Sequence, residues 1–113
     1  MSNDGFWAAA DELCRSSEHV VDRSARTDHP RYPGWTYPLD YGHLGGTKAG
    51  DGVEIDVWFG SASPARVTGV LCTLDLGKLD SEVKYLWRCK DTEVEEILRF
   101  YAQSSMHVLI IRR

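Results

Sequence analysis

The sequence predicts a mainly β, α+β domain in which a small β-barrel carries one helix near each end of the chain. Short apolar stretches bounded by turn residues recur through the middle of the chain, whereas helical periodicity is confined to its two ends. The predicted elements do not alternate between strand and helix, so a parallel sheet is not expected. With 113 residues, 42% of them hydrophobic, the chain is long enough for one core, so residues 1–113 are expected to form a single domain.

The N-terminal part predicts a helix, a short strand and an irregular segment. Asn3 or Asp4 can cap a helix that runs to about Arg15, with an apolar stripe of Phe6, Ala9, Ala10 and Leu13. Residues 19–23 are typical of a short strand. Residues 25–36 are expected to be irregular because two prolines and a glycine interrupt them.

The most unusual stretch is 37–56, YPLDYGHLGGTKAGDGVEID, which places two tyrosines before a glycine-rich segment that we expect to form a turn. Asp51, Glu54 and Asp56 follow at the start of a strand predicted over 54–60. Carboxylate oxygens gathered in this way suit Mg²⁺ or Ca²⁺. Asp56 stands between two apolar residues, so its side chain faces either solvent or a site.

The remaining elements complete the predicted barrel. A turn at 61–64 precedes strands over 66–76 and 82–87. Thr92 followed by Glu95 predicts a capping box for a helix over 93–103. Residues 106–111 form a last apolar strand, whose edge could pair with a second copy, and we therefore expect a homo-oligomer.

Charge and cysteine content restrict the function classes. A formal net charge of −4 disfavours binding to nucleic acid or to an anionic membrane. No signal-like or membrane-spanning segment is expected, and three cysteines without CxxC spacing indicate reduced thiols. These features predict a cytoplasmic protein without nucleic-acid or membrane partners.

Three segments in order, YPLDYGHLGGT, DGVEIDV and DLGKLDSEVK, resemble the active-site segments of soluble family I inorganic pyrophosphatases. In that family a YPxNYG segment and a threonine precede a DGDPxDV motif, and two aspartates five residues apart follow. The residues that match this pattern are Tyr37, Tyr41, Thr47, Asp51, Asp56, Asp75 and Asp80. The resemblance covers roughly residues 20–87.

The resemblance implies a five-stranded OB-like barrel whose mouth binds Mg²⁺, or alternatively Mn²⁺, and hydrolyses pyrophosphate or a related phosphoanhydride. Its metal-binding residues would be Asp51, Asp56, Asp75, Asp80 and, in the first strand, Asp22. Its substrate-binding residues would be Arg31, Tyr37, Tyr41 and Lys84, and its catalytic residues Asp51, Glu54, Asp56 and Tyr41. Divalent cations suit this chemistry because pyrophosphate is densely charged.

Two departures from the family pattern affect the expected activity. Val53 stands where the family has the aspartate that accepts a proton from the attacking water, and valine can neither bind a cation nor accept a proton. We hypothesise that Glu54 partly replaces it, since Glu54 and Asp56 would point to one face of a strand. The chain is also shorter than its relatives and lacks some of their basic residues, for which Arg23, Arg26 or Arg31 could compensate.

Two other function classes stay open. The chain could be a non-catalytic module that binds a phosphate compound or a nucleotide in the same cleft. It could also be an OB-like protein-interaction domain whose acidic mouth has no catalytic role. His29 and His43 lack helical metal-binding spacing, so a surface or phosphate-side role is favoured for them.

Overall fold

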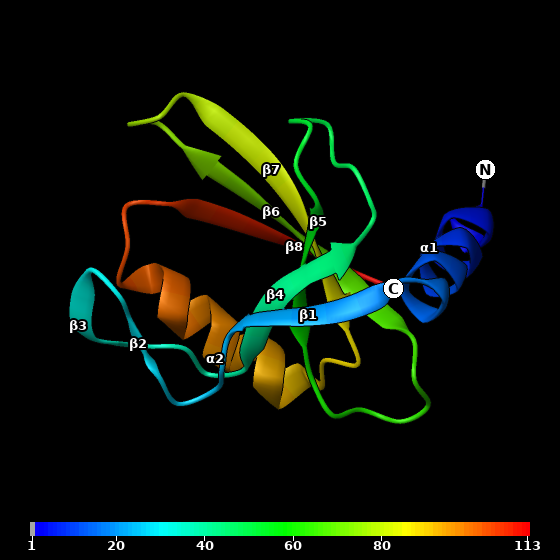
Figure 1. Cartoon of the computed structure of the whole chain (residues 1–113), viewed down its shortest axis with the longest axis horizontal. Helices are drawn as coiled ribbons and strands as arrows, with labels where there is room; N and C mark the ends of the chain where they lie inside the picture. The colour runs from blue at the N-terminus through cyan, green and yellow to red at the C-terminus, as the bar shows by residue number, and fades with distance from the viewer. Residues whose placement is uncertain (1) are drawn as a thin grey trace.

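A six-stranded sheet forms the centre of the structure, a computed structural model that describes residues 2–113 (Figure 1). The strand order is β1-β4-β5-β7-β6-β8, and every neighbouring pair is antiparallel except β5 and β7. The strands are β1 (Glu18–Arg23), β4 (Asp40–Gly45), β5 (Ile55–Phe59), β6 (Val67–Asp75), β7 (Asp80–Trp87) and β8 (His107–Arg112). A second sheet contains only β2 (Asp28–His29) and β3 (Tyr32–Thr36).

Two helices cover opposite faces of the six-stranded sheet. On one face α1 (Asp4–Ser16) packs around Trp7, Ala10, Cys14, Leu44, Val57, Val67, Val70 and Trp87. On the other face α2 (Asp91–Ala102) packs around Tyr37, Leu39, Trp58, Leu71, Leu86, Cys89, Val94, Ile97, Phe100 and Tyr101. Successive residues Val57 and Trp58 of β5 are both fully buried, in different clusters, because side chains alternate across a strand. The sheet therefore has an apolar core on each face.

The glycine-rich segment is a strand in its first half, which corrects the expected turn. Gly42 lies in the middle of β4, where an added Cβ would collide with the backbone carbonyl of Val20 in β1. The residue is therefore needed for the close approach of two strands rather than for chain reversal. The turn begins only after β4, where Gly46 and Gly52 take positive φ angles of 76° and 89°.

The sequence-predicted α+β class agrees with the structure, but the closed five-stranded barrel is not found among residues 2–113. Strands β1 and β8 stand at the two ends of the order, and no pairing in the described chain joins them. The sheet has six strands because residues 40–45 form β4 between β1 and β5, in addition to the predicted last strand, which pairs with β6 as β8. Closure depends on long-range pairing, which short strand patterns do not specify.

Two local predictions are also corrected. Residues 25–36 are not irregular throughout, because β2 and β3 form a small hairpin around Pro30 and Arg31. The helix predicted over 93–103 begins earlier, at Asp91. The Glu93 carboxylate caps its N-terminus, in place of the predicted capping box of Thr92 and Glu95. Glu93 Oε1 accepts hydrogen bonds from the backbone nitrogens of Lys90 at 2.8 Å and Ser61 at 3.1 Å. The hydrogen bond to Ser61 is a tertiary contact, so the local sequence around the helix does not predict it.

Helix α1 has 13 residues and helix α2 has 12. Within residues 2–113, neither helix combines the length and the apolar character that a membrane span requires.

Candidate functional site

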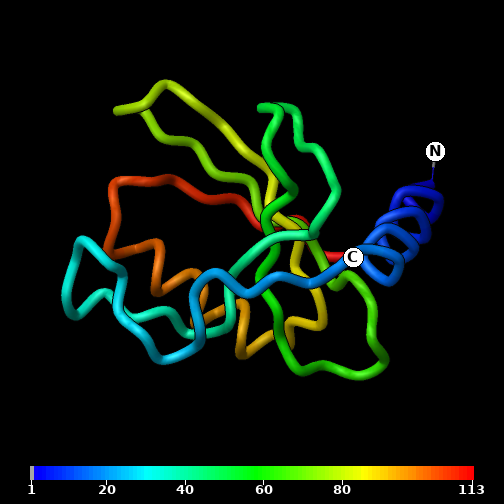
Figure 2. The backbone as a smooth tube through the Cα atoms, viewed as in Figure 1, coloured from blue at the N-terminus to red at the C-terminus, as the bar shows by residue number. Residues whose placement is uncertain are grey.

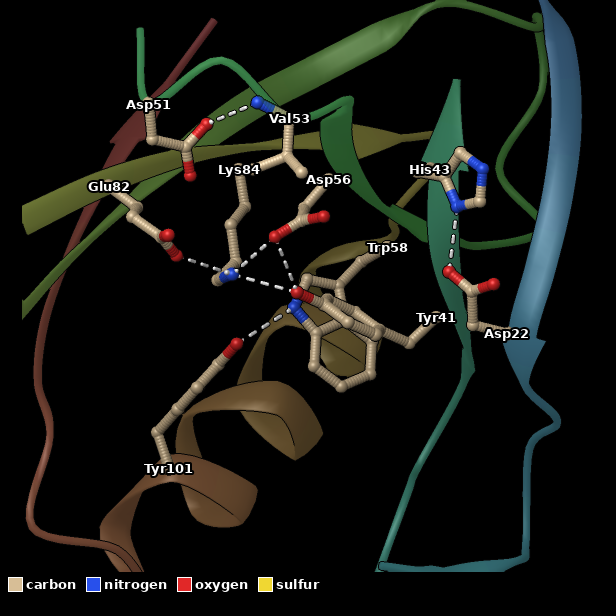
Figure 3. Close-up of polar contacts among 10 residues, drawn as sticks. All are labelled: Asp22, Tyr41, His43, Asp51, Val53, Asp56, Trp58, Glu82, Lys84 and Tyr101. Carbon is tan, nitrogen blue, oxygen red and sulfur yellow. Dashed lines mark hydrogen bonds and ion pairs between the residues drawn. The ribbon is translucent and has the colours of Figure 1, made fainter. Parts of the chain in front are cut away.

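A buried lysine on the α2-facing side of the sheet connects three strands through hydrogen bonds (Figure 3). The ammonium group of Lys84 donates to the Tyr41 hydroxyl at 2.7 Å, to Asp56 Oδ2 at 2.9 Å and to Glu82 Oε2 at 3.3 Å. The Tyr41 hydroxyl in turn donates to Asp56 Oδ2 at 3.0 Å. Only 8% of the Lys84 side chain is exposed, against 36% of Asp56 and 38% of Glu82. The network therefore has a buried positive centre and a solvent-facing acidic rim.

Strand register brings these residues together. Tyr41 pairs with Trp58 across β4 and β5, and His43 pairs with Asp56, so all four side chains lie on one face. On β7, Glu82, Lys84 and Leu86 occupy the same face by alternation, and Leu86 lies opposite Trp58. The apolar half of this face is covered by α2. The polar half begins at Tyr41 and Lys84.

Burial determines the protonation of the network. Removal from solvent raises the pKa of Tyr41 far above its usual range, so its O–H is retained and donates to Asp56. Burial alone would lower the pKa of Lys84, but the oxygens of Tyr41 and Tyr101 and the hydrogen bonds to Tyr41 and Asp56 outweigh that effect and raise it. Burial also raises the pKa of Tyr101 to about 12. At neutral pH the site thus contains a cationic lysine and neutral tyrosines.

Tyr101 of α2 contacts the network indirectly, through Trp58. Its hydroxyl oxygen accepts a hydrogen bond of 3.3 Å from Trp58 Nε1, and both residues belong to the α2-side core. The Trp58 ring lies 4.6 Å from the Tyr41 ring, measured between centroids. Packed aromatic rings therefore fix the position of the Tyr41 hydroxyl.

A second polar pair lies beside this network, between β1 and β4. His43 Nδ1 is 2.8 Å from Asp22 Oδ2, and this hydrogen bond raises the pKa of His43, with Glu54 and Asp56 adding to the effect. Asp22, expected to bind metal, therefore has one carboxylate oxygen engaged by a histidine.

This pair predicts a pH dependence. Because the pKa of His43 is raised by folding, its stabilising effect should be complete below about pH 6.5, the unfolded value, and disappear as pH rises through the folded pKa. The pair is partly exposed, so the effect on the free energy of unfolding should stay below about 1 kcal/mol. An NMR titration should show the pKa of His43 falling in Asp22→Asn. Asp80→Asn is the control, and an equal fall in that variant would contradict the assignment to Asp22.

Five of the sequence-predicted residues line one of two cavities: Asp51, Glu54 and Asp56 the first, and Arg31 and Asp75 the second. One cavity, of about 610 Å³, lies between the β4–β5 loop and the β6–β7 hairpin, which rise from the same end of the sheet (Figure 2). Its lining includes Asp51, Glu54, Asp56, Glu82 and Lys48. The other cavity, of about 970 Å³, is lined in part by Arg31 and Asp75. The predicted metal-binding aspartates are thus divided between different parts of the molecule.

Besides Tyr41 and Lys84, three sequence-predicted residues lie outside the lining of both cavities. Tyr37 is buried in the α2-side core, 6.0 Å from Tyr41 between ring centroids. Asp80 is exposed and faces Asp75 across the β6–β7 hairpin. Asp22 is exposed beside His43. Tyr41, Asp56 and Lys84 are the predicted residues that the structure brings into mutual contact.

The carboxylates provide a partial fit to a divalent cation. In residues 2–113 no three histidine, cysteine, aspartate or glutamate side chains are close enough to hold a metal ion by themselves. Asp51 Oδ1 accepts from the backbone nitrogen of Val53, and Asp56 Oδ2 is engaged by Tyr41 and Lys84. The second oxygen of each carboxylate has no protein hydrogen bond in the described chain. This donor set suits Mg²⁺, which commonly binds one or two carboxylates together with substrate phosphates.

Sequence reasoning missed several members of the site. Glu82 shares the site face with Lys84 because side chains alternate along β7, and this alternation could have indicated it. Tyr101 could not be placed, because its approach depends on how α2 packs across the sheet. Neither a protein-family model nor a curated protein matches this chain.

Proposed function

We propose that this protein binds a phosphoanhydride, either pyrophosphate or a nucleotide, at the Tyr41–Asp56–Lys84 network and hydrolyses it with Mg²⁺ or Mn²⁺. The supporting observation is that Tyr41, Asp56 and Lys84, which the resemblance assigns to one site, are hydrogen-bonded to one another from three different strands. A buried ammonium surrounded by titratable groups is costly to a fold and frequent in functional sites.

The network gives each residue a distinct task. Lys84 supplies positive charge beneath the site, although its three N–H groups are already engaged, so a phosphate oxygen would be attracted by charge or would displace Glu82. Tyr41 holds Asp56 Oδ2 by a hydrogen bond, so Asp56 Oδ1 remains available to a cation. Bound Mg²⁺ would neutralise phosphate charge and activate water. Asp56, with Asp51 and Glu54 on the same cavity, would hold it.

A phosphate-release assay tests the proposal. The unmodified protein should release phosphate from pyrophosphate or a nucleoside triphosphate slowly and only with Mg²⁺ or Mn²⁺, because Val53 is no base. Asp56→Asn should lower the rate by about 10²-fold or more, since it removes charge at the site. Asp80→Asn is the matched control: Asp80 is exposed on the β6–β7 hairpin and lines neither cavity, so this variant should keep the rate of the unmodified protein. Absence of both metal-dependent turnover and metal-dependent pyrophosphate binding would contradict the proposal.

A non-catalytic phosphate- or nucleotide-binding module is the second candidate. It is favoured by the occupied hydrogen bonds of Lys84 and by the absence of a proton acceptor at position 53. Binding without turnover would support it. A protein-interaction domain would instead bind neither phosphate compounds nor Mg²⁺.

The proposal also includes the OB-like relationship, a cytoplasmic location and assembly into a homo-oligomer. The end strand β8 supports assembly, because Leu109 and Ile111 are exposed on it, at 61% and 44%. An unpaired apolar edge of this kind is available to a second copy.

A further inference from the structure

Three chain segments that are distant in sequence provide most of the lining of the cavity of about 970 Å³. It opens between the β2–β3 hairpin, the turn joining β6 to β7 and the segment joining α2 to β8 (Figure 1). Its volume is at the upper end of the range of roughly 300–1,000 Å³ for small-molecule sites. The space therefore suits a ligand larger than pyrophosphate.

The charge of this cavity is opposite to that of the chain. Arg23, Arg31 and Lys78 line it together with a single carboxylate, Asp75, whereas the whole chain has a net charge of −4. Asp75 Oδ1 is engaged by the backbone nitrogens of Gly77 and Lys78, which reduces its influence on the cavity. A concave basic surface on an acidic protein favours an anionic ligand.

Aromatic rings form another wall of the cavity. His29 stacks on Trp35 with centroids 4.9 Å apart, and the Tyr32 ring lies 5.1 Å from His29. Trp35 is anchored to α2, because it stacks on Phe100 at 4.3 Å and donates from Nε1 to the Phe100 carbonyl at 2.7 Å. Tyr32 is 58% exposed, so a fixed aromatic cluster ends in a ring that is open to a planar partner. Base-sized rings stack well on such surfaces.

Arg23 connects this cavity with the Lys84 network. Arg23 pairs with Tyr41 across β1 and β4, and the Tyr37 ring is stacked with the His29 ring at 6.2 Å between centroids. The rings of Tyr37 and Tyr41 are 6.0 Å apart, and Tyr41 contacts Lys84 directly. Basic and aromatic groups therefore extend continuously from the network to Tyr32.

We infer that the ligand of this protein is a nucleotide, with its base stacked on Tyr32 and its phosphates directed past Arg31, Lys78 and Arg23 toward Lys84. This inference rests on the proposed function, since it names the substrate class of that site. Pyrophosphate alone would use the basic groups and leave the aromatic wall without a role. A nucleotide uses both.

Calorimetric titration with ADP, and separately with inorganic pyrophosphate, tests the inference. ADP should bind at least fivefold more tightly than pyrophosphate, because stacking adds to the phosphate contacts. Tyr32→Ala should weaken ADP binding by about fivefold or more and change pyrophosphate binding less than twofold. Tyr32→Phe keeps the aromatic ring, so its affinity for ADP should equal that of the unmodified protein. Lys78→Ala should weaken both ligands.

Leu79→Ala is the matched control, because Leu79 is 85% exposed on the neighbouring turn and does not line the cavity. Equal affinity for ADP and pyrophosphate, or unchanged ADP affinity in Tyr32→Ala, would overturn the inference. Tighter binding of a single-stranded RNA oligonucleotide than of ADP would also overturn it. The titrations measure binding and not turnover, so the two proposals can fail separately. Hydrolysis of pyrophosphate without ADP binding would refute the nucleotide inference alone. Binding of ADP without phosphate release would refute only the proposed hydrolysis.

Discussion

Replacing Val53 by aspartate is expected to raise the rate of phosphate release from pyrophosphate by about 10²-fold or more, a gain typical of a positioned general base. Val53 is held in the β4–β5 loop by two hydrogen bonds: its nitrogen donates to Asp51 Oδ1 at 3.1 Å, and its carbonyl accepts from Ala49 N at 2.6 Å. Val53 is 57% exposed, so the substitution should cost little stability. The measurement is a phosphate-release assay with Mg²⁺, comparing the two proteins.

Two further variants identify the source of the gain. Val53→Asn has nearly the same shape as the aspartate variant but no proton-accepting carboxylate, so its rate should stay at the level of the unmodified protein. Glu54→Gln should weaken Mg²⁺ binding in the unmodified protein if Glu54 partly replaces the missing carboxylate. Equal rates in Val53→Asp and Val53→Asn would rule out a base at position 53, and unchanged Mg²⁺ affinity in Glu54→Gln would rule out the replacement.

Replacing Lys84 by alanine is expected to lower the free energy of unfolding by about 3 kcal/mol. Removing one member of a buried ion pair typically costs about 3–5 kcal/mol, because the opposite charge loses its partner. We expect the lower end of that range, since Asp56 and Glu82 are each more than a third exposed and water can partly replace the lysine. Urea denaturation at neutral pH measures the change.

A matched series separates charge from packing at Lys84. Lys84→Met retains most of the aliphatic side chain, so it should be less destabilising than alanine. Adding Asp56→Asn to Lys84→Met should recover part of the loss, because one of the two carboxylates that lose Lys84 is then neutral. Lys48→Ala, at an exposed position, should change stability by less than about 0.5 kcal/mol. A loss below 1 kcal/mol for Lys84→Ala would show that the network contributes little to folding.

The resemblance and the strand patterns together predicted three residues of the network, because each of these side chains lies within or beside a recognisable motif. Tyr41 and Asp56 were predicted from their motifs, and Lys84 from its position after the second pair of aspartates. The hydrogen bonds between them could not be predicted, because they depend on β5 lying beside β7 in parallel register, a pairing between distant segments. The contact of Glu82 with Lys84 could not be predicted either, because Lys84 is held in place by the same pairing.

The sequence by itself determined the class of the fold, the two helices, most strand positions and the acidic and tyrosine-rich content of the site. These features depend on local periodicity, turn residues and the chemistry of single side chains. Tertiary structure alone decided that Gly42 serves strand contact, that the predicted metal-binding aspartates do not share one site, and that Arg23, Arg31 and Lys78 line a cavity with an aromatic wall. The physical reason is that register and helix docking place residues from distant segments in contact, and no local pattern specifies those long-range pairings.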